Sequence, residues 1–204
     1  MATCSSGIAT DAVVVVRRRP PTGVRHRIGH RIGSRAGRIH WKGSNLTYRE
    51  GRFWQPDVTV ATVVVRDGRL LVVEETVGGQ LVLNQPAGHL EPDESLVEAA
   101  LRETLEETGW DVRLTAFVGA YQWKAPEQSD GTQGGHFLRF AFAAEPVQHD
   151  AQRPLDDGIV RAFWLTPAEL EAEQARHRSP LVWRAVTDFL AGRRHPLDLV
   201  QHLA

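Results

Sequence analysis

The residues best suited to chemistry are the acids between positions 88 and 110. Seven acidic side chains lie within 17 residues there, against a single base, Arg102. Three of the acids, Glu103, Glu106 and Glu107, are spaced i, i+3, i+4, which places their carboxylates on one face of an α-helix. Neighbouring carboxylates repel one another, whereas Mg²⁺ or Mn²⁺ would stabilise them because these ions prefer oxygen ligands. The spacing alone leaves two interpretations equally open, a divalent-metal site and a solvated acidic surface helix.

The local sequence predicts the helix that such a site requires, from about Ser95 to Thr108. Ser95 and Glu98 have the spacing of a capping box, in which each side chain bonds the other residue's backbone N–H. Gly109 follows, where a left-handed backbone conformation would end the helix. An apolar stripe is expected to face the core and consists of Val97, Leu101, Leu105 and Thr108.

This region resembles the Nudix box, G-x5-E-x7-R-E-U-x-E-E-x-G-U, in which U is a bulky apolar residue. The fixed positions are matched by Gly88, Glu94, Arg102, Glu103, Glu106, Glu107 and Gly109. Trp110 suits the last U, while Thr104 at the first U is the one departure. The resemblance implies a Nudix hydrolase in which a loop–helix–loop holds a divalent metal against a diphosphate linkage.

The same resemblance implies roles for individual residues. We expect Glu103, Glu106 and Glu107 to hold Mg²⁺, or Mn²⁺, together with the backbone carbonyl of Gly88. Glu103 is the first candidate for the base that takes a proton from water. Arg102 is expected to orient these carboxylates, with Glu94 as its partner. Its alternative role is an ordinary i, i+4 ion pair on the helix surface, with Glu98 or Glu106.

Further segments resemble the phosphatase NudJ subgroup of Nudix hydrolases, over roughly residues 56–200. They read PDVTVATVVV, LLVVEET, NQPAGHLE, QWKAP, FLRFAF and RSPLV. This subgroup hydrolyses nucleoside di- and triphosphates and 4-amino-2-methyl-5-hydroxymethylpyrimidine diphosphate, with release of phosphate. The alternatives are another Nudix specificity, for ADP-ribose or dinucleoside polyphosphates, and a Nudix-fold binding module without catalysis.

Residues that would contact the organic part of the substrate are less clearly marked. Tyr121 and Trp123 lie at i, i+2 on a predicted strand, so their rings share a face and could stack on a base, although core packing is the competing role. Arg139, like His136, lies on the next strand and could meet a phosphate. Gln85, just before the box, could hydrogen-bond a base.

Hydrophobic periodicity predicts an α+β fold, with a mixed β-sheet between layers of helices. Strands are expected near 58–66, 70–76, 81–83, 112–123, 136–144 and 162–165, and further helices near 167–175 and 180–191. Asp67-Gly68 is a hairpin signal, and Gly78-Gly79 is a second turn. The polar, Gly-rich stretch 124–135 is typical of a binding loop.

Composition limits the class of protein. The single cysteine excludes an intramolecular disulfide, which suits a reducing compartment, and no apolar run approaches the length of a membrane span. We therefore expect a cytoplasmic monomer that acts on a small nucleotide or pyrimidine diphosphate, without nucleic-acid or membrane partners.

Residues 1–55 differ in charge from the rest of the chain. They carry eleven basic residues against two acidic ones, whereas the remainder carries 13 against 23. We interpret 1–55 as a disordered extension and 56–204 as the Nudix hydrolase domain. The extension could be an inert tail, a product of a start codon assigned too early, a nucleic-acid-binding arm or an Arg-rich transit peptide.

Overall fold

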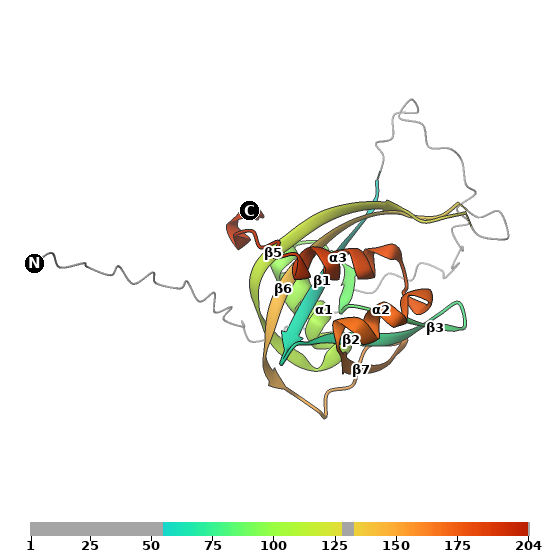
Figure 1. Ribbon diagram of the computed structural model, residues 1–204. Helices are drawn as coiled ribbons and strands as arrows, with labels where there is room; N and C mark the ends of the chain where they lie inside the picture. The colour runs from blue at the N-terminus through green and yellow to red at the C-terminus, as the bar shows by residue number, and fades with distance from the viewer. Residues whose placement is uncertain (1–54, 128–132, 204) are drawn as a thin grey trace, which may run out of the picture. The chain divides into compact units, whose positions relative to one another are not determined.

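The structure is a computed structural model that describes residues 55–127 and 133–203. Within these residues the chain forms a mixed sheet with helices on both sides (Figure 1). The strands are β1 (Asp57–Arg66), β2 (Arg69–Val77), β3 (Gln80–Asn84), β4 (Ala87–His89), β5 (Trp110–Lys124), β6 (His136–His149) and β7 (Ile159–Leu165). The helices are α1 (Leu96–Thr108), α2 (Pro167–Ala172) and α3 (Pro180–Leu190), with single 3₁₀ turns η1 (Gln174–Arg176) and η2 (Leu197–Leu199).

The sheet combines one parallel pairing with antiparallel ones. Its strand order is β3-β2-β1-β6-β5, while β4 pairs with β1 and β7 pairs with β2. Strands β1 and β6 run parallel, with Thr59 opposite Arg139, and the other pairings are antiparallel. Because β1 contacts β2, β4 and β6, it connects the two halves of the sheet.

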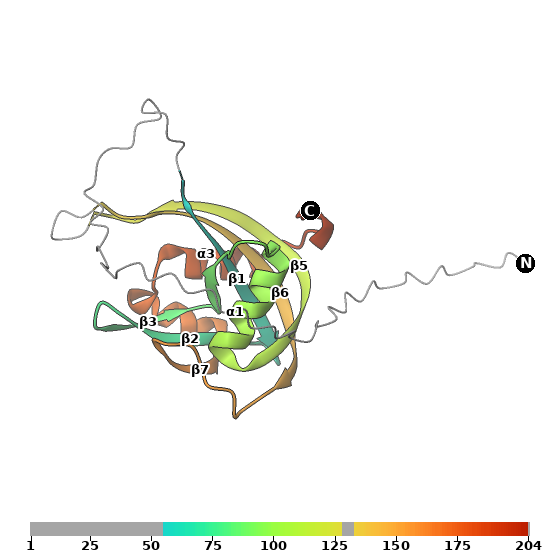
Figure 2. The same cartoon turned by 180° about the vertical axis from the view of Figure 1, so that it is seen from behind.

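The two faces of the sheet are covered by different helices. Helix α1 lies on one face, and α2 and α3 lie on the other, as the two opposite views show (Figures 1 and 2). Ala99 and Ala100 of α1 pack on a core that includes Phe142. Leu170 of α2 and Val186 of α3 pack on the core of the opposite face. The predicted α/β/α sandwich is therefore confirmed.

Most predicted elements are present, with three differences. Strand β4 and the turn η2 were not predicted, and the helix expected over 167–175 ends at Ala172 and gives way to η1. The predicted hairpin at Asp67-Gly68 is confirmed, with φ angles of 50° and 73°. Leu101 of the predicted apolar stripe is only half-buried, whereas Ala100 and Thr104 are fully buried.

No helix in the described part of the chain is long and apolar enough to cross a membrane. The extension predicted for 1–55 lies outside the described residues except for its last position. Five residues of the predicted binding loop, 128–132, also lie outside them.

Candidate active site

Both ends of α1 are fixed by the local interactions that the sequence predicted. Ser95 and Glu98 form a complete capping box, in which the Ser95 N–H donates to the Glu98 carboxylate at 2.9 Å and the Glu98 N–H donates to Ser95 Oγ at 3.1 Å. Gly109 ends the helix with φ 69°, and its N–H donates to the carbonyl of Leu105. These caps set the rotation and the length of the helix that carries the glutamates.

Thr104, the departure from the Nudix pattern, has a specific partner on the sheet. Its hydroxyl lies 2.7 Å from the hydroxyl of Thr62 on β1 and donates to the carbonyl of Ala100, and both threonines are fully buried. A polar side chain at this position is therefore accommodated because β1 supplies a matching hydroxyl.

Three carboxylates meet at the exposed side of α1. Ligand atoms of Glu103, Glu106 and Asp156 all lie within 4.8 Å of one another. Asp156 comes from the loop between β6 and β7, and its backbone N–H donates to the carbonyl of Glu106 at 3.2 Å. Sequence reasoning missed Asp156, and the consecutive acids Asp156 and Asp157 before Gly158 were the available signal. The cluster joins two of the three glutamates predicted as metal ligands to a residue about 50 positions further along the chain.

Arg102 holds this part of the site together. Its guanidinium donates to Glu94 at 2.6 and 3.0 Å, to Glu103 at 2.8 Å and to Glu106 at 3.1 Å. It also donates to the backbone carbonyl of His89 at 3.0 Å. The predicted contact with Glu94 is present, as is the alternative pair with Glu106. The bond to Arg102 lowers the pKa of the Glu94 carboxyl, so Glu94 stays ionised.

Glu107 occupies a different environment from the other two glutamates. Its carboxylate is buried and accepts a hydrogen bond from the backbone N–H of Ala87 at 2.8 Å. Burial raises the pKa of Glu107 to about 8, and burial also raises the pKa of Glu103. Gly88 lies against Glu103, because a Cβ built there would be 2.1 Å from Cδ of that side chain. Burial thus shifts the carboxyls of Glu103 and Glu107 toward the neutral form when no cation is bound.

The predicted substrate residues lie on the α3 side of the sheet. Tyr121 donates to Asp188 of α3 at 3.0 Å, and Trp123 stacks on Phe137 with ring centroids 5.4 Å apart. Tyr121 and Trp123 line a cavity of about 700 Å³ between β5 and α3. This cavity has no lining residue in common with the cavity that contains Glu106.

Arg139 and Gln85 are both buried, and Gln85 contacts α3. Arg139 lies between Thr59 and Asn84, with a separation of 3.4 Å to each, and burial lowers its pKa to about 10, so it remains charged at neutral pH. Gln85 donates to the carbonyl of Val182 at 2.6 Å, and its own carbonyl oxygen has no hydrogen-bond partner within the described residues. Both side chains therefore lie inside the fold, and neither is hydrogen-bonded to the cluster of Glu103, Glu106 and Asp156 within the described residues.

Comparison with known proteins agrees with this geometry. A family model of the NUDIX domain matches residues 55–184. The phosphatase NudJ of Escherichia coli K12 is 43% identical over 147 residues, which are 72% of this chain and 92% of that protein. The phosphatase NudJ of Shigella flexneri matches to the same extent. The resemblance to the NudJ subgroup is therefore confirmed.

Solved structures of Nudix proteins share the fold of this chain. A NUDIX hydrolase from Nitrosomonas europaea is 47% identical with a TM-score of 0.68, and the match covers 73% of this chain and 98% of that one. A UDP-X diphosphatase is 17% identical with a TM-score of 0.54, over 71% and 67% of the two chains, and supports the fold alone. With the domain match and the identity to phosphatase NudJ, these findings show that the chain belongs to the Nudix hydrolases, enzymes that act on phosphoanhydride bonds.

Proposed function

We propose that this enzyme is a metal-dependent phosphatase of nucleoside di- and triphosphates and of 4-amino-2-methyl-5-hydroxymethylpyrimidine diphosphate. The cluster of Glu103, Glu106 and Asp156 carries the proposal, because three carboxylates within 4.8 Å suit a hard divalent cation. The identity of 43% to phosphatase NudJ supports inorganic phosphate, and not pyrophosphate, as the released product.

The residues that would hold Mg²⁺, or Mn²⁺ in its place, are the three cluster carboxylates, Glu107 and the backbone carbonyl of Gly88. These groups fit the ion because all of them offer oxygen ligands. The raised pKa values of Glu103 and Glu107 also fit, since a nearby cation would oppose the effect of burial and favour the ionised form of both. When bound, the ion would neutralise phosphoryl oxygens and lower the pKa of a coordinated water.

Glu103 is the proposed proton acceptor. Its carboxylate is held by Arg102 at 2.8 Å and by the close approach of Gly88, so its position is fixed before substrate binds. Burial raises the pKa of Glu103 above its ordinary value, which makes this carboxylate a better proton acceptor than an exposed one. Arg102 acts as a positioning residue, since its guanidinium is already occupied by Glu94, Glu103 and Glu106.

We assign recognition of the organic part of the substrate to the α3 side of the sheet. The cavity between β5 and α3 contains the aromatic rings of Tyr121 and Trp123, which offer stacking surface to a base. Gln85 has an unpartnered carbonyl oxygen within the described residues, and Arg139 is a buried cation with only long hydrogen bonds. These four side chains are our candidates for substrate contact.

The test is an analysis of the products formed from a nucleoside triphosphate with Mg²⁺. We expect orthophosphate as the first product, and a loss of turnover of about 100-fold or more in Glu106→Gln and in Glu107→Gln. Glu145→Gln, which alters a surface ion pair with Arg113, is the matched control and should keep full activity. Pyrophosphate or a mononucleotide as first product would instead support another Nudix specificity.

We also propose that the enzyme acts as a cytoplasmic monomer on small molecules, without a nucleic-acid partner. The single cysteine supports a reducing compartment, because it cannot form an intramolecular disulfide. Sedimentation equilibrium of the full chain tests the oligomeric state, and a dimer at micromolar concentration would contradict the proposal.

A further inference from the structure

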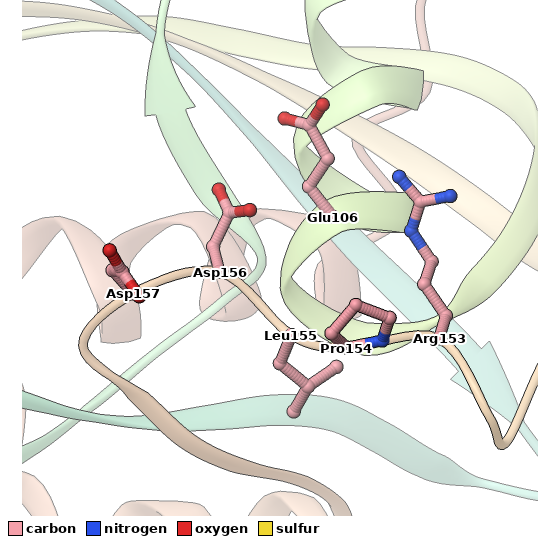
Figure 3. Close-up of a pocket in the computed structure, with 6 residues that line it drawn as sticks. All are labelled: Glu106, Arg153, Pro154, Leu155, Asp156 and Asp157. Atoms are coloured by element: carbon pink, nitrogen blue, oxygen red, sulfur yellow. The ribbon is translucent and has the colours of Figure 1, made fainter.

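A cavity of about 660 Å³ lies beside the carboxylate cluster and has a mixed charge (Figure 3). It is lined by Glu106 of α1 and by five consecutive residues of the loop between β6 and β7, which are Arg153, Pro154, Leu155, Asp156 and Asp157. Arg153 is the one cation among these lining residues of the described chain. In Figure 3 its guanidinium and the carboxylates of Glu106 and Asp156 extend to the same side.

Arg153 differs from the other arginines of the described residues, because none of the described residues forms an ion pair, a hydrogen bond or a ring contact with its side chain. Every other arginine there has an ion pair, a hydrogen bond or an aromatic ring against its guanidinium. Residues 55–127 and 133–203 offer Arg153 no such contact, although three carboxylates line the same cavity. A half-buried guanidinium in this position is available to an anionic ligand.

The loop that carries Arg153 is fastened to α1 on both sides of it. The Asp150 N–H donates to the carbonyl of Gly109 at 2.9 Å, and the Asp156 N–H donates to the carbonyl of Glu106 at 3.2 Å. Between these two points the Arg153 N–H donates to the carbonyl of Asp150 at 3.2 Å. The backbone of Arg153 is therefore held next to the last turn of the helix that bears the cluster.

We propose that Arg153 binds the unesterified terminal phosphate of the substrate. The proposal rests on the proposed function, because it places the phosphate chain at the cluster of Glu103, Glu106 and Asp156. A guanidinium can donate two parallel hydrogen bonds to the oxygens of a terminal phosphate, which carries more charge than an esterified one.

The lining of the cavity supports a terminal group there. Within the described residues it contains no aromatic side chain, so it offers no stacking surface to a second nucleoside. The aromatic lining lies instead in the other cavity, at Tyr121 and Trp123. Arg153 thus selects substrates whose phosphate chain ends at the cluster over substrates in which both phosphates are esterified.

Equilibrium binding tests this role without turnover. The probe is the non-hydrolysable α,β-methylene analogue of ADP, titrated with Mg²⁺ into the full chain by calorimetry. Arg153→Ala should weaken binding by about tenfold to a hundredfold, and Arg153→Lys by less, because lysine keeps the charge without the planar fork. The control is Arg69→Ala, which removes an exposed arginine paired with Glu169 and should change binding less than about twofold.

A second probe, a diadenosine methylenediphosphonate, lacks a free terminal phosphate. Its binding should be equally weak in the wild type and in Arg153→Ala. Unchanged binding of the ADP analogue in Arg153→Ala, or equal losses for the two probes, would overturn the proposal. If the wild type releases no phosphate from nucleoside di- or triphosphates, the proposed function is wrong. If the wild type releases phosphate but Arg153→Ala has the same KM as the wild type, only the role of Arg153 is wrong.

Discussion

Gly88 is needed for space and not for an unusual backbone conformation. Its φ is not positive, but a Cβ there would lie 2.1 Å from Cδ and 2.2 Å from both carboxylate oxygens of Glu103. Any side chain at this position must therefore displace the carboxylate that we assign as the base. The first glycine of the Nudix box is therefore required here because it leaves room for the carboxylate of Glu103.

We accordingly expect Gly88→Ala to lower kcat by about 100-fold, because displacement of a reacting group by about 1 Å has an effect of that size. The thermal unfolding midpoint should change less than kcat, since the displaced Glu103 lies beside the half-buried Glu106 and the exposed Asp156. Steady-state kinetics and a melting curve measure the two effects. In a Glu103→Ala variant the methyl group introduced at position 88 would meet no carboxylate, so adding Gly88→Ala should not lower kcat further. A further loss of about 100-fold in kcat in the double variant would refute the steric explanation.

Glu107 makes the stability of the metal-free protein depend on pH. Burial raises the pKa of Glu107 to about 8, above its ordinary value of 4.5. A carboxyl with a higher pKa in the folded state stabilises the fold at low pH, and this contribution is lost as pH rises from about 4.5 through 8. In EDTA, the free energy of unfolding should therefore fall between pH 5 and pH 8, by up to about 1.4 kcal/mol per pH unit from this group.

Denaturant unfolding at several pH values tests this expectation. Glu107→Gln removes the titrating group, so its stability in EDTA should vary less with pH than that of the wild type. Mg²⁺ should restore stability to the wild type most strongly at pH 8, where the ionised carboxylate is otherwise uncompensated. Parallel pH profiles of wild type and variant in EDTA would argue against the assignment.

Among the structural elements, the contact between α1 and β1 depends on a pair of hydroxyls. Thr62 donates to Thr104, and Thr104 donates to the carbonyl of Ala100. Thr104→Val would leave the buried Thr62 hydroxyl without an acceptor and should cost about 1–3 kcal/mol of unfolding free energy. Replacing both residues with valine should recover most of this loss, because no buried donor then remains unpaired.

A double-mutant cycle with urea unfolding measures this coupling. Thr62→Val alone should cost less than Thr104→Val, since Thr104 keeps its bond to Ala100. Additive losses in the double variant would show that the two hydroxyls do not depend on each other.

The ends of α1 were predictable from sequence because they depend on neighbours within four residues. Ser95, Glu98 and Gly109 all take their predicted roles. The buried face was harder to predict, because hydrophobicity favours large side chains such as Leu101. In the structure, small residues such as Ala100 and Thr104 face β1 and let the helix approach it closely.

Other features could not be predicted from local patterns. Strand β4 has only three residues and forms by pairing with β1, so it has no periodicity of its own. Asp156 reaches the cluster through the β6–β7 loop, and its place depends on the bond to Glu106. The neighbouring acid Asp157 marks this stretch as acidic, but the tertiary contact that brings Asp156 to α1 cannot be read from adjacent residues.

At the scale of the whole molecule, the described fold and the proposed site lie within residues 55–203. The NUDIX domain match begins at residue 55, and every residue of the carboxylate cluster lies beyond it. We expect a chain that begins at residue 55 to keep kcat/KM within about twofold of the full chain. Activity assays of both chains test this.

The same pair of chains tests the nucleic-acid-binding interpretation of the basic extension. We expect neither chain to bind RNA in a filter assay at physiological salt. Binding by the full chain alone would assign a function to residues 1–55 and would contradict our expectation that the protein has no nucleic-acid partner.

The parallel pairing of β1 with β6 has a consequence for the order of folding. Thr59 and Arg139, which face each other in this pairing, are separated by 80 residues. A contact of that range forms only after a large loop has closed, so it is slow to form compared with the capped helix between them. Asp156 follows β6 in the chain, so α1 is complete on the emerging polypeptide well before its third carboxylate arrives. The acidic ligands of the cluster are therefore all present only after β6 and the loop that follows it have been made.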